Sequence, residues 1–487
     1  MKFLKLSLAA SVALGAFSTA SFAQPLEDAI KGIDVSGYLR YRYNDDRYDA
    51  NGFNKDSVAN SNATHRWKAV ADFKAPVADN VAFNFGILYN NESQNVNHGN
   101  GVELDPDNQP GVITPGISNG EGSGKDGSFG VSTFNAVITP DSTATTVIIG
   151  KQRLATPVTN AGDDDRGTGI LALNSDLEGF TFAAGAFDSW SIDDLAAYDN
   201  ALGVNFQGYK TGGNDGVAIT KPLYALAGIY GVDTAYGHFS AQLWGFYIQD
   251  AVDALGVGEL AWNNATFDVA LQYALAKLDN SDSSILGALH PTSNGAGTAS
   301  IQGVPTNRAN ISEANDLFVI NLGADFAQEY NVPLDVKLGW VTNFQDGTAV
   351  TLNDDGTIFK YAGAIWWQNN ATAISTSALL PRGVAGFGSE QEISVFYGAI
   401  GYSMVDSRLR IGLDYVWGNN EVTAGNATIK DTDFQEITPR ISWKHNKNLT
   451  ISGYYAYLMT DRPDSYQGNT FDDETRARAR VEVKYSF

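Results

Sequence analysis

This 487-residue sequence has no cysteine and only five histidines. Without cysteine there are no disulfides, so the fold must be held by side-chain packing or by hydrogen-bonded ladders. The histidines fall in unrelated loops or strand ends, at His65, His98, His238, His290 and His445. An enzyme of the serine-hydrolase type needs a histidine beside a serine and an acid. This scatter therefore argues against an enzyme.

Basic residues are also scarce, with 32 Lys and Arg against 55 Asp and Glu. A nucleic-acid partner needs a basic face, so the acidic balance argues against one. The chain is nevertheless 43% hydrophobic and 11% aromatic, which is not the composition of a disordered protein. No linker or composition break divides it, and we expect one folded domain.

Long apolar runs are missing apart from the first residues. Residues 1–23 read as a secretory signal peptide: Lys2 and Lys5 precede the apolar stretch 6–17, and Ala23 ends a small-x-small cleavage site. Residues 24–32 would then form a short periplasmic segment, either an amphipathic helix or a disordered tail. With no apolar stretch for a spanning helix, a membrane protein of this sequence must be a closed barrel.

Strict two-residue alternation dominates residues 33–487, and the last twelve residues show it best. One face of 476–487 is charged or polar, while the other is apolar and carries Ala477, Ala479, Val481, Val483, Tyr485 and Phe487. Successive side chains of a strand point to opposite faces of the sheet. Runs of about 9–11 residues with this pattern can cross a bilayer as tilted strands, with the apolar face toward lipid. We therefore predict an all-β fold, a transmembrane antiparallel up-and-down β-barrel.

Counting these runs predicts about eighteen strands. We place them at 33–44, 64–75, 81–90, 128–139, 145–154, 168–175, 180–189, 223–232, 238–248, 257–263, 266–277, 316–327, 332–343, 392–403, 408–418, 433–444, 449–459 and 476–487. Short turns alternate with long connections, which we expect to face outward from the cell, at 91–127, 190–222, 278–315 and 344–391. An even strand number brings both chain ends to the short-turn side, as in outer-membrane barrels.

Basic residues on the polar faces gather on strands that become neighbours if the first and last strands pair. They predict a basic wall in the channel: Arg40, Arg42, Arg66, Lys68, Arg408, Arg410, Arg440, Lys444, Arg476, Arg478 and Arg480. The connection 154–167 is the candidate for a constriction loop folded into the barrel, and it carries Asp163, Asp164, Asp165 and Arg166. Carboxylates facing a basic wall across a narrow aqueous gap would create a transverse field that filters solutes by size and polarity.

Three stretches resemble the Campylobacter major outer membrane protein family. They are PLEDAIKGIDVSGYLRYRY at 25–43, IIGKQ at 148–152 and GTG at 167–169. The resemblance implies an eighteen-stranded, homotrimeric porin whose pore is narrowed by an inward loop, with a calcium ion near that constriction. Phe487, at the end of an aromatic strand, looks like the signal that such barrels present to the outer-membrane assembly machinery.

Within the loop, Asp163 is the residue that the family pattern carries over as a calcium ligand, and Asp165 is a second candidate. Ca²⁺ binds six to eight oxygen ligands, which adjacent carboxylates can supply. An acidic, solvated loop without metal explains the same residues, and both readings stay open.

The predicted function is an outer-membrane porin for passive diffusion of ions and small hydrophilic solutes. Its expected partners are outer-membrane lipid, the assembly machinery, two further copies of the chain and the solutes themselves. Two alternatives remain. A substrate-specific channel would need a lengthwise aromatic track, to which Trp366 and Trp367 could contribute, and the long loops could also serve as a surface adhesin.

Overall fold

A computed structural model describes most of the predicted strands and part of the connections. The described residues are 32–48, 62–90, 128–163, 165–192, 210–211, 217–219, 221–279, 281, 300–301, 304–305, 312–352, 359, 361–367, 372, 374, 376–378, 391–424, 427–461, 465–466, 469–470 and 473–487. The predicted signal peptide and nearly all of segment 24–32 lie outside them.

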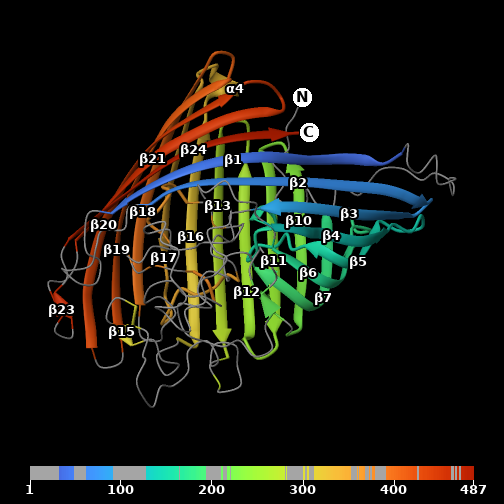
Figure 1. Ribbon diagram of the computed structural model, residues 1–487, viewed down its shortest axis with the longest axis horizontal. Helices are drawn as coiled ribbons and strands as arrows, with labels where there is room; N and C mark the ends of the chain where they lie inside the picture. Colours follow the sequence, from blue (N-terminus) through green and yellow to red (C-terminus); the bar gives the residue numbers. More distant parts are fainter. Residues whose placement is uncertain are drawn as a thin grey trace, which may run out of the picture.

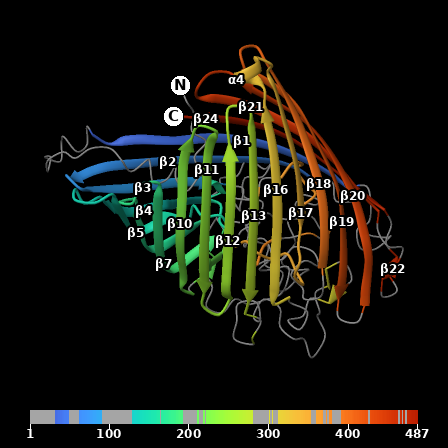
Figure 2. The ribbon, with the colours of Figure 1, turned by 180° about the vertical axis from the view of Figure 1, so that it is seen from behind.

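Eighteen long strands form one closed antiparallel sheet (Figures 1 and 2). They are β1 (Asp34–Tyr48), β2 (Asn62–Ala78), β3 (Val81–Asn90), β4 (Ser128–Ile138), β5 (Thr145–Arg153), β6 (Arg166–Asn174), β7 (Phe180–Ile192), β10 (Leu223–Thr234), β11 (Gly237–Ile248), β12 (Val252–Asn263), β13 (Phe267–Leu278), β16 (Ala314–Asp325), β17 (Leu334–Thr342), β18 (Gln391–Met404), β19 (Leu409–Ala424), β20 (Ala427–Lys444), β21 (Leu449–Asp461) and β24 (Glu474–Ser486). Each pairs with the next along the chain, and β24 pairs with β1.

Closure between the first and last strands is continuous to the end of the chain. Tyr38 is opposite Ser486, and the pairing runs to Tyr48 opposite Arg476. Beyond β24, Gly37 and Phe487 exchange backbone hydrogen bonds of 3.1 and 3.0 Å. A closed sheet leaves no unpaired edge, which is the requirement for backbone in a bilayer.

The two-residue period places apolar side chains on the outer face of the barrel. Among them, Leu39, Leu413 and Val481 are 53%, 45% and 47% exposed, while their neighbours Arg40, Asp414 and Arg480 point to the interior. Every one of the eighteen predicted strands is present. The structure extends several of them, most of all β19 and β20, which are separated only by residues 425–426.

Further short elements were not predicted. They are β8 (Lys210–Thr211), β9 (Val217–Ile219), β14 (Ser300–Ile301), β15 (Val304–Pro305), β22 (Ser465–Tyr466), β23 (Asn469–Thr470), the 3-10 helix η1 (Ala161–Asp163) and the helix α4 (Ala327–Tyr330). Among the described residues no helix is long and apolar enough to cross a membrane.

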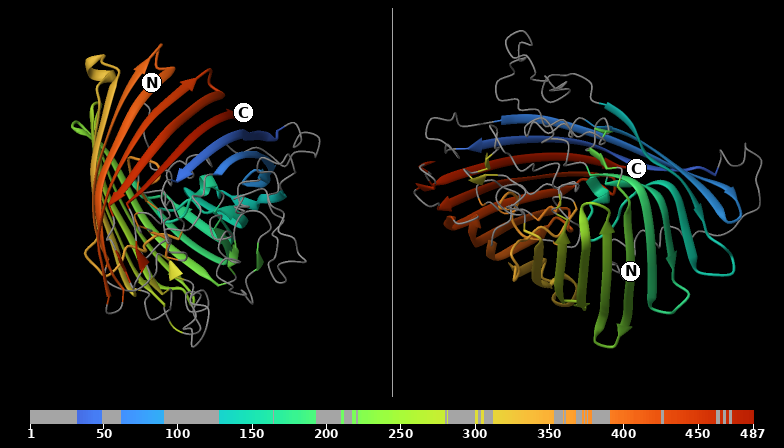
Figure 3. Two further views of the ribbon diagram at one scale, coloured as in Figure 1. Left: turned by 60° about the vertical axis from the view of Figure 1, so that its left-hand side comes forward. Right: turned by 90° about the horizontal axis from the view of Figure 1, so that it is seen from below.

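The interior contains an apolar core, which a simple water-filled cylinder would not have. Buried inner side chains of the strands from β7 round to β21 pack against residues of the β17–β18 connection. We call the described part of 343–378 the long inward segment; its orange stretches lie within the curve of the strands (Figure 3). The prediction that 344–391 faces outward was therefore wrong for this part of it. Val350 and Leu352 have no exposed surface, and Trp366 is 1% exposed.

Candidate functional site: the barrel lumen and its inward segments

Glu436 of β20 binds the long inward segment to the barrel wall. Its carboxylate has no exposed surface and accepts the backbone N–H groups of Ala364 at 2.5 Å and Ile365 at 3.0 Å. The hydroxyl of Thr438 donates to the same carboxylate at 2.5 Å. A buried carboxylate is costly unless its oxygens are hydrogen-bonded, and here both accept backbone donors. The segment is therefore anchored to β20 through its backbone.

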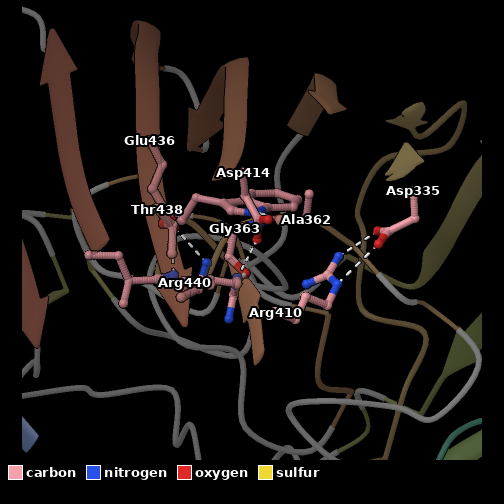
Figure 4. Close-up of polar contacts among 11 residues, drawn as sticks. Asp335, Ala362, Gly363, Arg410, Asp414, Glu436, Thr438 and Arg440 are labelled. Carbon is pink, nitrogen blue, oxygen red and sulfur yellow. Dashed lines mark hydrogen bonds and ion pairs between the residues drawn. The ribbon is translucent and has the colours of Figure 1, made fainter. Parts of the chain in front are cut away.

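Arg440 and Asp414 form a second anchor beside it (Figure 4). Arg440 Nε donates to Asp414 Oδ2 at 2.6 Å, and its Nη2 donates to the carbonyl of Gly363 at 2.7 Å. The N–H of Gly363 donates to Asp414 Oδ2 at 3.1 Å. The ion pair thus binds both backbone groups of a single residue. Gly363 has φ +86°, and an added Cβ would lie 2.6 Å from the Trp366 ring, so glycine is required here.

Aromatic packing completes the docking of the segment. Trp366 stacks on Phe434 of β20 with ring centroids 6.0 Å apart, and its Nε1 donates to the carbonyl of Ala362 at 2.8 Å. Burial raises the pKa of the Tyr361 hydroxyl well above its ordinary value. Trp366 is therefore part of the interior packing, and it does not belong to a track along the pore.

Residues 154–165, the short inward loop, are the predicted constriction loop. Leu154 and Val158 belong to the interior apolar core, and the N–H of Leu352 donates to the carbonyl of Val158 at 2.9 Å. The two inward segments, which come from opposite sides of the barrel, therefore join inside it. Only one inward-folded connection was predicted, whereas the structure has two among its described residues.

The acidic stretch of the short inward loop is only partly described. Asp165 has no exposed surface, and its Oδ2 accepts the N–H of Asn160 at 2.7 Å. This bond closes the loop, so the carboxylate has a structural partner. The side chain of Asp163 and all of Asp164 lie outside the described residues. Arg166 begins β6 and is 6% exposed.

Calcium at Asp163 and Asp165 stays a prediction. Within the described part of the chain, no group of three or more His, Cys, Asp or Glu could hold a metal ion. Asp165 is the only placed carboxylate of the pair, and it already accepts a backbone donor. The placed residues alone therefore do not make a calcium site.

The predicted basic wall lies on consecutive strands of the closed barrel, and four of its eleven basic residues form ion pairs with acids. Four ion pairs are Arg42–Glu482 at 2.9 Å, Arg410–Asp335 at 2.5 Å, Arg440–Asp414 at 2.6 Å and Arg478–Asp46 at 2.5 Å. The Arg410 pair is bidentate (Figure 4). The wall therefore has a smaller positive excess than the sequence suggested.

Two of the predicted wall residues lie at the end of the barrel that carries the short turns. Arg408 is in the β18–β19 turn, where it donates to the carbonyls of Lys444 and His445 at 3.2 and 2.5 Å. Its guanidinium lies over the Trp443 ring, 4.7 Å from the centroid. Arg408 is thus outside the wall, because β19 begins one residue after it, and Lys444 is exposed at the end of β20.

The remaining wall residues lie further in. Arg40 and Lys68 are cross-strand partners on β1 and β2 and are 8% and 2% exposed. Arg66 is opposite Arg42 in the same pair of strands. Arg476 is near the start of β24, opposite Leu458 of β21.

The sequence did contain a signal for the missed inward segment. Residues 359–367 read FKYAGAIWW, which is too apolar for a loop exposed to water. The inner faces of β18 to β20 are also apolar where they meet it, at Val395, Val416 and Phe434. These features could have shown that the loop folds inward. The acidic partners Asp46 and Asp335 could not be found in this way, because pairing across strands depends on register.

A closed barrel with an apolar outer face, a charged interior and inward-folded segments defines an outer-membrane porin, a channel rather than an enzyme. The sequence profile of the Campylobacter major outer membrane protein family matches residues 1–485, and the chain belongs to that family. It is therefore a protein of the bacterial outer membrane. No curated protein matches the chain closely enough to be called a relative.

Solved structures of porins share the fold at low sequence identity. OccAB1 of Acinetobacter baumannii is 14% identical with a TM-score of 0.55, covering 93% of this chain and 97% of that chain. A BenF-like porin of Pseudomonas fluorescens Pf-5 is 13% identical with a TM-score of 0.57, covering 94% and 99%. OccK3 (OpdO) of Pseudomonas aeruginosa is 14% identical with a TM-score of 0.54, covering 95% and 97%.

Proposed function

We propose that this porin is a passive channel for ions and small hydrophilic solutes, whose constriction has a basic wall on one side and the acidic short inward loop on the other. The observation that carries the proposal is the junction between Leu352 and Val158, where the two inward segments meet inside the barrel. One side of the interior is filled by apolar side chains, so the water path must follow the other side.

That other side is the charged wall. Its strands β20, β21, β24, β1 and β2 are consecutive around the barrel. Paired guanidinium and carboxylate groups orient water strongly, and an apolar solute must displace that water to pass. A polar solute replaces those hydrogen bonds, so we expect permeation to fall with solute size and with apolar surface.

Single-channel recording in planar bilayers tests this proposal. We expect an ohmic conductance, and liposome swelling rates that fall with solute mass across a series of neutral sugars. A purified chain that inserts without conducting would refute the proposal.

Ion selectivity tests the acidic loop. Replacing Asp163, Asp164 and Asp165 together by Asn should shift the reversal potential toward anion preference. An unchanged reversal potential would show that the short inward loop does not set the selectivity.

We also propose that the channel is a homotrimer and that Phe487 is read by the assembly machinery. A single inserted channel whose conductance closes in three equal steps would support three separate pores. Deleting Phe487 should lower the amount of barrel assembled in the outer membrane of cells. It should lower the refolding yield of the purified chain less. Calcium is tested by equilibrium dialysis of the wild type against Asp163→Asn, where equal binding would exclude Asp163 as a ligand.

A further inference from the structure

Arg480 of β24 has a neutral side-chain partner, whereas several arginines of the charged wall are paired with an acid. Its Nε donates to the amide oxygen of Asn44 at 2.8 Å. Among the residues that the structure describes, no carboxylate forms an ion pair with it. Arg42, Arg440 and Arg478 are each neutralised by an acid. Arg480 therefore contributes a positive charge that no described carboxylate neutralises through an ion pair.

Arg480 is also held in a fixed position. Arg440, Tyr454 and Arg480 are direct cross-strand neighbours on β20, β21 and β24. The guanidiniums of Arg440 and Arg480 lie 5.2 and 5.3 Å from the Tyr454 ring centroid. Two cations sharing one ring gain cation–π attraction but also repel each other. An anion bound between them would relieve that repulsion.

A cavity of about 310 Å³ lies over these residues, and it is lined by Arg410, Arg440, Arg480, Tyr454, Ser442, Ser452 and Glu482, among others. Ser442 and Ser452 are cross-strand partners in the row next to Arg440 and Tyr454. Their hydroxyls add two neutral donors. Arg480 supplies a planar fork suited to an oxyanion, whereas Nε and Nη2 of Arg410 and Arg440 are engaged with Asp335, Asp414 and the Gly363 carbonyl. These two arginines contribute positive charge at the edge of the cavity.

We propose that this cavity is a binding site for the oxyanion group of a permeating solute, a carboxylate or a phosphate. Arg480 is its primary ligand through both terminal nitrogens, and the two serine hydroxyls assist. The proposal rests on the proposed channel function and adds to it a saturable step for small anions. Such a site raises the local concentration of anionic solutes on the water path, at the cost of slower release.

The test is block of the single-channel KCl conductance by inorganic phosphate or by acetate at constant ionic strength. We expect a saturable block of the wild type by at least one of the two anions, and the anion that blocks identifies the solute class. In Arg480→Gln the half-blocking concentration should rise about tenfold or more, because two charge-assisted hydrogen bonds are lost.

Lys484→Gln is the matched control, since it removes one positive charge from the same face of the same strand. Lys484 lies over the Tyr38 ring at 4.4 Å and does not line the cavity. We expect its half-blocking concentration to stay within about twofold of the wild type, because the fork of Arg480 is intact. An equal effect of both substitutions would show that only the general field matters and would overturn the site.

Arg480→Lys separates charge from geometry and serves also if Arg480→Gln does not assemble. The lysine keeps the charge but lacks the planar fork, so we expect clearly weaker block. The proposal would be overturned if Arg480→Lys had the same half-blocking concentration as the wild type. It would also be overturned if neither anion blocked the wild type saturably. The channel function fails separately, by absence of KCl conductance in the wild type.

Discussion

Glu436 gives the sharpest test of how the interior is organised. It is the buried carboxylate that accepts the N–H groups of Ala364 and Ile365. In Glu436→Gln one oxygen becomes an NH₂ group, which faces a backbone donor and cannot accept from it. A hydrogen bond to a charged group contributes roughly 1.5–3 kcal/mol. We expect docking of the long inward segment to weaken by about 2 kcal/mol, which raises its undocked fraction about 30-fold.

Hydrogen–deuterium exchange of the detergent-solubilised porin measures this directly. Peptides covering 359–367 should exchange faster in Glu436→Gln, while peptides from the strands should not change. Single-channel traces should show more frequent transitions to a higher conductance, because the undocked segment clears the lumen. Glu392→Gln, which changes an exposed carboxylate on β18, two strands away from β20, is the control. Unchanged protection and conductance in Glu436→Gln would refute the anchoring role of this carboxylate.

Three further predictions follow from the same packing. Trp366→Ala removes a buried indole and should lower the free energy of unfolding of the barrel by roughly 3–5 kcal/mol in denaturant titrations. Little change would show that the ring does not contribute by packing on Phe434. Because burial raises the pKa of Tyr361, docking should be fully stable below the unfolded tyrosine value of about 10 and weaken above it; Tyr361→Phe should abolish that dependence in exchange measurements at alkaline pH. Gly150 has φ +122°, and an added Cβ would lie 2.4 Å from the carbonyl oxygen of Phe134. Gly150→Ala should therefore lower the heat-modifiable fraction on gels, whereas Gly130→Ala, whose Cβ meets nothing within 4 Å, should not.

The sequence by itself determined the barrel. A strand's two faces are set by alternation between neighbours in the chain, so each of the eighteen runs could be recognised from its own residues. The polar faces also predicted the inner side of the barrel for Arg40, Arg42, Arg440 and Arg480. Closure of the first strand on the last followed from the strand number and the apolar outer face, because an open edge cannot lie in lipid.

Only the tertiary structure decided what fills the barrel. The long inward segment has no period, and its position depends on Glu436 and Asp414, which lie about 70 and 50 residues away in the chain. The pairing of Arg478 with Asp46 joins the two ends of the chain. Such contacts depend on strand register and on the path of a loop through three dimensions, and neither is encoded in local alternation. For the same reason, the sequence indicated a strongly positive wall, whereas the fold pairs Arg42, Arg410, Arg440 and Arg478 with carboxylates and gives Arg480 the neutral amide of Asn44.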